Sequence, residues 1–204
     1  MNNCGKRLAH GIIVLICILH NLVSGALAQP DAEAEFNKTL VTSAVEQTRQ
    51  TLFYDPSYVK IPYPGGDVSI DRGVCSDVII RCFRKVGIDL QKDVHEDMKC
   101  SFQAYPKKWG LNKTDTNIDH RRVYNLMCFF SRNNKNIPID SADRFLPGDI
   151  VAWRLDNGHP HIGLVTDQTT VSGTPLMVHN IGLGARLEDV LHEWKIIGHY
   201  RWFK

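Results

Sequence analysis

The spacing of apolar residues changes along this 204-residue chain, and that change most restricts the fold. Apolar residues recur at helical spacing in the first two thirds, whereas the last third has short alternating runs separated by Gly, Asn, Asp, Ser and Thr. The helical patterns cover residues 31–53, 74–86 and 123–130, and the strand patterns cover 149–153, 161–165, 176–179 and 196–202. We therefore predict an α+β domain in which a helix packs on a largely antiparallel sheet. Residues 54–73 are expected to form an ordered loop, and residues 87–120 an irregular segment.

The first residues have the pattern of a cleaved leader. Lys6 and Arg7 precede an apolar run that ends near Ala26-Leu27-Ala28, a small-x-small cleavage pattern. The run is shorter than the roughly 20 residues of a spanning helix, so a stable membrane anchor is not expected. We predict a signal peptide at 1–28, an N-terminal helix at 29–53, one domain at 54–204, and a periplasmic or secreted location.

The net charge and the cysteine count bear on whether the chain binds nucleic acid, holds a metal or forms disulfides. Without its leader the chain has 22 basic and 22 acidic residues, because the leader contains two of the 24 cations and no acid. A neutral chain does not point to nucleic acid as a partner. Four cysteines remain at positions 75, 82, 100 and 128, and no C-x-x-C metal knuckle occurs. Disulfide pairing among Cys82, Cys100 and Cys128, and the oligomeric state, stay open.

Cys75 lies where residues 54–73 lead into the helical pattern at 74–86. The field at a helix N-terminus lowers a thiol pKa, and the free amides of the first turn can stabilise an oxyanion. Cys75 is therefore a candidate nucleophile, whereas Cys82 on the same apolar stripe has neither advantage. The alternative is that Cys75 is a core residue or a disulfide partner.

Two histidines are candidates for the base. His161 begins one predicted strand and His179 nearly ends the next. In an antiparallel pair of even register these two side chains share a face, with Asn180 on the other. One ring could accept the thiol proton while the other orients it. A metal site that includes His159 is the alternative, but no carboxylate lies at a familiar ligand spacing, so neither a metal nor another cofactor is predicted.

The motifs around these residues resemble a known family. Cys75 in GVCSDVIIR, Pro147-Gly148-Asp149, His161 in HIGLVTD and His179 in VHNIG match, in order and spacing, the NlpC-type cell-wall cysteine peptidases of the papain-like superfamily. The wider sequence from about 54 to 200 is similar to a bacterial domain-of-unknown-function family, number twelve eighty-seven. One departure is that Val74-Cys75-Ser76-Asp77 replaces the usual Asp-Cys-Ser-Gly.

The resemblance implies an exported cysteine peptidase or amidase. Cys75 would be the nucleophile, His161 the base and His179 the orienting group. The substrate would be an amide bond in peptidoglycan peptides, cleaved through a thioester. An acyltransferase with the same triad, or a non-catalytic module that binds cell wall or protein, are the alternatives. Guanidinium groups suit carboxylates, so substrate-binding candidates are Arg72, Arg121 and Arg122.

Overall fold

The computed structural model describes residues 28–139 and 145–203, so the predicted signal peptide lies outside it apart from Ala28. The described helices are α1 (Ala28–Gln50), α2 (Cys75–Lys85), α3 (Leu90–Cys100) and α4 (Val123–Arg132). The strands are β1 (Phe53–Tyr54), β2 (Arg72–Gly73), β3 (Ile150–Arg154), β4 (Pro160–Thr169), β5 (Pro175–Asn180), β6 (Ala185–Glu188) and β7 (Lys195–Tyr200). Within these ranges no helix combines the length and apolarity needed to cross a membrane.

Strands β3 to β7 form one antiparallel sheet in the order β6-β5-β4-β3-β7. Leu164 pairs with Val178 between β4 and β5. Between β5 and β6, His179 pairs with Arg186. The two short strands β1 and β2 pair in parallel next to the start of α2, with Tyr54 opposite Gly73.

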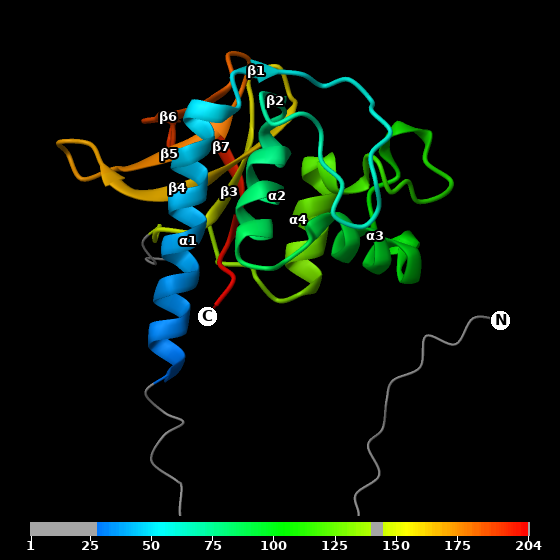
Figure 1. Cartoon of the computed structure of the whole chain (residues 1–204), viewed down its shortest axis with the longest axis horizontal. Coiled ribbons are helices and arrows are strands. Elements are labelled where there is room, and N and C mark those ends of the chain that lie inside the picture. Colours follow the sequence, from blue (N-terminus) through cyan, green and yellow to red (C-terminus); the bar gives the residue numbers. More distant parts are fainter. Residues whose placement is uncertain (1–27, 140–144, 204) are drawn as a thin grey trace, which may run out of the picture.

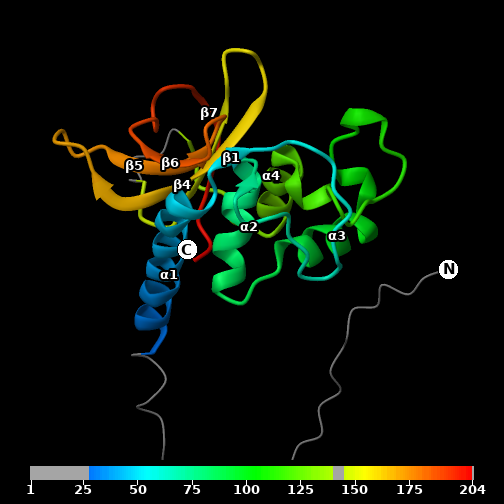
Figure 2. The same ribbon diagram turned by 45° about the horizontal axis from the view of Figure 1, so that its top comes forward.

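The helices pack against one face of this sheet. Figures 1 and 2 show α1 and α2 side by side on that face, with α3 and α4 beyond α2. Ile162, Leu164 and Val178 point from the sheet into the helices and share a core with α2 residues such as Val78 and Phe83. Alternate residues of the same strands point to the other face, where a second cluster contains Val151, Trp153, Val165, Met177 and Leu191.

The α+β prediction, with a helix-start cysteine on a largely antiparallel sheet, is confirmed. Helix α2 ends where Gly87 was expected to stop it, and Gly87 adopts a φ of +80°. The short strands β1 and β2 were not predicted, and two larger differences concern α3 and β6. Helix α3 lies in the segment predicted to be irregular, and β6 forms the edge of the sheet.

The end of α1 is joined to the start of β6. The amide of Ala185 donates to the carbonyl of Thr51 at 2.8 Å. A Cβ on the preceding Gly184 would lie 2.5 Å from the same carbonyl oxygen, so only glycine allows this approach. The first helix and the sheet edge are therefore held together near residues 51 and 185.

Candidate active site

Cys75 is the first residue of α2, and the start of this helix is fixed by Asp77. The Asp77 carboxylate accepts the amide of Val74 at 2.7 Å, which satisfies one of the donors that a helix start leaves free. Val74 itself has no side-chain acceptor, so the carboxylate at the third helical position supplies the cap. The amides of Cys75 and Ser76 remain directed at the Cys75 sulfur.

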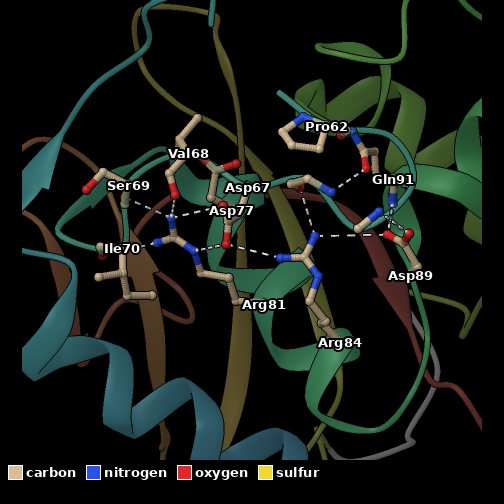
Figure 3. Close-up of polar contacts among 12 residues, drawn as sticks. Pro62, Asp67, Val68, Ser69, Ile70, Asp77, Arg81, Arg84, Asp89 and Gln91 are labelled. Atoms are coloured by element: carbon tan, nitrogen blue, oxygen red, sulfur yellow. Dashed lines mark hydrogen bonds and ion pairs between the residues drawn. The ribbon is translucent and has the colours of Figure 1, made fainter. Parts of the chain in front are cut away.

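Basic side chains of α2 hold the loop that precedes Cys75, as Figure 3 shows. Arg81 donates to both oxygens of Asp67, at 2.9 and 3.1 Å, and to the carbonyl of Arg72 at 3.0 Å. Arg84 donates to Asp67 at 3.1 Å. The side chain of Gln91 on α3 bridges the carbonyl of Pro62 and the amide of Gly66. The expected loop at 54–73 is thus ordered by side chains that follow Cys75 in sequence.

The sulfur of Cys75 is buried against β4. Its residue is 6 % exposed and carries a free thiol. The amide of Ile162, in the peptide that joins His161 to Ile162, donates to the sulfur. The thiol pKa is raised to about 12, chiefly by burial and also by the charge of Asp77, although the amides of Ile162, Ser76 and Cys75 act in the opposite direction. The resting thiol is therefore protonated and needs a base before it can act as a nucleophile.

A hydrogen-bonded relay begins at His161, the residue before Ile162. His161 Nε2 lies 2.9 Å from His179 Nδ1, and His179 Nε2 lies 3.0 Å from Glu188 Oε2. The β4–β5 register places the two imidazoles diagonally on one face, as predicted, and Asn180 points the other way to donate to the carbonyl of Gly73. Both rings lie on the sheet face that carries Trp153 and Met177, whereas Cys75 lies on the face covered by the helices. Cys75 therefore contacts β4 through the backbone amide of Ile162.

The carboxylate of Glu188 determines which ring nitrogens carry protons. An ionised carboxylate can only accept, so His179 Nε2 is the donor and its Nδ1 is left as an acceptor. His161 Nε2 must then donate to His179 Nδ1. The remaining nitrogen of His161, Nδ1, has no proton. It is the basic position of the relay.

The two imidazoles of the relay are enclosed by aromatic rings and are uncharged at rest. Trp153 stacks on His161 with 5.7 Å between ring centroids, and Trp194 packs edge-on against both His161 and His179. A Cβ on Gly163 would lie 3.0 Å from the Trp153 ring, so the glycine makes room for the indole. The pKa of His161 is lowered to about 3, chiefly by burial and also by His179. Burial also lowers the pKa of His179, against the opposite effect of Glu188.

The three predicted arginines are not brought together. Arg121 is buried and donates to Asp77 twice at 2.9 Å, and it also reaches the carbonyls of Asp55 and Ser57. We therefore assign Arg121 to the support of the α2 start rather than to substrate binding. Arg72 is half-exposed and pairs with Asp55 at 3.2 Å. The guanidinium of Arg122 lies 4.4 Å from the centroid of Trp109.

Two residues near the thiol and the relay were missed from sequence. Glu188 ends the relay, and the alternation in Ala185-Arg186-Leu187-Glu188 is the signal that could have revealed its strand. Tyr54 lies near Cys75, and its pKa is raised first by burial and then by its interaction with Cys75. No pattern in the sequence marks Tyr54, since pairing of β1 with β2 brings it to the helix start.

A cavity of about 210 Å³ opens beside the relay, lined by His179, Ile181, Gly182, Leu183, Gly184, Arg186 and Glu188. A second cavity of about 380 Å³ lies on the other side of β6 and also includes Leu183, Arg186 and Glu188. Over the described ranges, no group of three or more His, Cys, Asp or Glu side chains is arranged to hold a metal ion.

The chain is similar to a sequence relative and to solved structures. The chain is 49 % identical over 199 residues to the uncharacterized protein YijF of Escherichia coli, covering 94 % of this chain and 97 % of that protein. An N-acetylmuramoyl-L-alanine amidase from Bacteroides uniformis has a similar fold, with a TM-score of 0.50, 11 % identity, and coverage of 81 % of this chain and 97 % of the amidase. NlpC1 from Trichomonas vaginalis matches with a TM-score of 0.44 and 12 % identity, over 82 % of this chain and 44 % of that protein.

The family model for the domain of unknown function DUF1287 matches residues 41–202, which contain Cys75, both histidines of the relay and Glu188. The match extends over most of the chain and includes α2 and the whole sheet. This chain therefore belongs to the DUF1287 family.

Proposed function

We propose that the protein is a cysteine hydrolase that cleaves an amide bond in cell-wall peptides. One observation carries the proposal: the Cys75 sulfur contacts the peptide that follows His161, and the ring of His161 begins a relay that ends on a carboxylate. A thiol, a base and an orienting carboxylate are the parts that nucleophilic catalysis by cysteine requires. The fold shared with an N-acetylmuramoyl-L-alanine amidase supports a cell-wall substrate.

The ring of His161 and the sulfur of Cys75 lie on different faces of the sheet, so the proposed proton transfer between them passes through one water molecule at the end of β4. In the first half of the reaction, the thiol proton reaches His161 Nδ1 by this route as the sulfur attacks the carbonyl carbon of the amide. The negative charge that develops on the carbonyl oxygen is stabilised by the amides of Cys75 and Ser76, which point to the sulfur from the first turn of α2. The C–N bond then breaks, and His161 returns the proton to the leaving nitrogen. A thioester between Cys75 and the acyl part of the substrate remains.

In the second half, water attacks the thioester. His161 accepts a proton from the water, the C–S bond breaks, and the thiol of Cys75 is restored as the carboxylic acid product leaves. His179 and Glu188 do not touch the substrate in these steps. They hold His161 with its Nδ1 unprotonated and stabilise the positive charge that its ring carries between proton transfers.

The test is hydrolysis of defined muropeptides followed by mass spectrometry. Replacement of Cys75 by Ala should abolish turnover, because no other group in the site can form the thioester. Cys82→Ala is the matched control, since Cys82 is a buried thiol on the same helix and contacts Gln47 rather than the relay. Undiminished turnover by the Cys75→Ala protein would refute the mechanism, and an amine adduct in place of the hydrolysed product would show acyl transfer.

A peptidoglycan substrate also requires export of the protein. We propose a periplasmic or secreted location, with cleavage of the leader near Ala28. The N-terminal sequence of the protein recovered from the periplasm or medium tests this proposal.

A further inference from the structure

Arg186 is the cation nearest the relay in sequence and in the sheet. It pairs with His179 across β5 and β6, and directly opposite residues have Cβ atoms about 5 Å apart on one face. Glu188, two residues further along β6, projects from the same face. Both side chains line the 210 Å³ cavity that reaches His179.

The guanidinium of Arg186 differs from those of the three arginines singled out from sequence. Arg121 is engaged by Asp77, Arg72 by Asp55, and Arg122 by the Trp109 ring. Within the described part of the chain, Arg186 is exposed and has no hydrogen-bond or ion-pair partner. Glu188 is next to it but directs Oε2 to His179. A full positive charge is thus available at the rim of the cavity.

The remaining lining of the cavity is apolar or glycine. Ile181 and Leu183 are 43 % and 72 % exposed, and Gly182 and Gly184 place bare backbone between them. The cavity is smaller than the pockets of about 300–1,000 Å³ that enclose drug-sized ligands. It suits one small aliphatic residue with an anionic end rather than a sugar ring.

We propose that Arg186 binds a free carboxylate of the peptide substrate, with an aliphatic group of the same residue against Ile181 and Leu183. The proposal rests on the proposed function, since it places this carboxylate next to the relay that acts on the scissile amide. A guanidinium matches a carboxylate through two parallel N–H donors, and such charged hydrogen bonds are stronger than neutral ones. Arg186 would then select substrates by charge while Cys75 and His161 act on the amide.

The experiment measures binding to the Cys75→Ala protein by titration calorimetry, so that it does not depend on turnover. The probes are a muropeptide with a free terminal carboxylate and the same peptide as a carboxamide. The free acid should bind about 10- to 100-fold more tightly than the amide, the range given by one or two charge-assisted hydrogen bonds. Adding Arg186→Gln should remove this difference, whereas Arg186→Lys should keep part of it.

Arg154→Gln is the matched control, because it removes the same charge from an exposed position at the end of β3. Equal affinity of the Cys75→Ala protein for acid and amide, or no binding of either, would refute the proposal. So would persistence of the difference after Arg186→Gln, or an equal loss for both peptides, which would mean that Arg186 only maintains the relay. Charge selection without turnover by the unaltered protein would contradict the hydrolase proposal and leave the role of Arg186 intact.

Discussion

A single carboxylate, Glu188, determines which nitrogens of the two imidazoles carry protons in this site. The side chain of Glu188 is 39 % exposed, yet it accepts a hydrogen bond from His179 and thereby fixes the tautomers of both buried imidazoles. Histidine is neutral in this chain of hydrogen bonds, because burial lowers the pKa of both rings. The negative charge of Glu188, on the edge strand β6, opposes this lowering of the His179 pKa.

We predict that Glu188→Gln lowers kcat roughly 10- to 100-fold, the range for residues that orient a catalytic group. Glu188 raises the pKa of His179, so removal of its charge should also move the acid limb of the pH profile to lower pH, since the base stays deprotonated further into acid. The measurement is kcat and kcat/KM against pH. Glu193→Gln, at an exposed position beyond β6, is the control, and an unchanged profile in Glu188→Gln would contradict the tautomer assignment.

At the level of elements, α2 is held at its start by a buried ion pair. Asp77 caps the helix and binds Arg121, which in turn holds the carbonyls of residues 55 and 57 over the helix start. Both side chains are almost fully buried, so removal of one leaves an uncompensated charge in the interior.

We expect Asp77→Ala to lower the free energy of unfolding by roughly 3–5 kcal/mol, because the charge of Arg121 would be left buried and the cap lost. Arg121→Met should cost a similar amount. The double variant should cost clearly less than the sum of the two, since neither charge is then unpaired. Urea unfolding of the four proteins measures this coupling, and strict additivity would show that the pair is not energetically linked.

The elements that could be predicted from sequence are those whose pattern is set locally. The apolar spacing after Cys75 indicates a helix, and the alternation around His161 and His179 indicates strands. Because 161 and 179 are both odd, an antiparallel pair of even register places the two rings on one face. Helix α3 was missed because its few buried apolar residues, Leu90, Val94 and Met98, are widely spaced among charged ones. Tyr54 was missed because pairing of β1 with β2, rather than local sequence, brings it to the helix start. Glu188 was missed because the short alternation of β6 was not identified as a strand.

Across the whole molecule, acid should destabilise the fold through buried histidines. Burial lowers the pKa of His120 and of His161 to about 3 each. The unfolded chain binds protons at these sites below about pH 6.5, whereas the folded chain does so only near pH 3. Their contribution to stability is therefore complete above pH 6.5 and is lost as the pH falls from 6.5 toward 3.

We predict that His120 and His161 each lower the free energy of unfolding by about 1.5 kcal/mol between pH 6.5 and pH 5. His120→Gln should remove about half of the decrease that the two share, because His120 lies outside the relay and its Nδ1 has no partner among the described residues. Urea unfolding at the two pH values measures the difference. His159→Gln, at an exposed position, is the control, and equal decreases in the wild type and His120→Gln would contradict the prediction.

The bond between Thr51 and Ala185 has a consequence for biosynthesis. It joins the helix that leaves the ribosome early to the strand that leaves it among the last, and that strand carries the carboxylate on which the proton relay ends. A nascent chain that stops before residue 188 contains the residues of α2 but lacks the carboxylate that orients the proposed base. In the proposed mechanism, the thiol therefore has no complete base until synthesis is nearly finished.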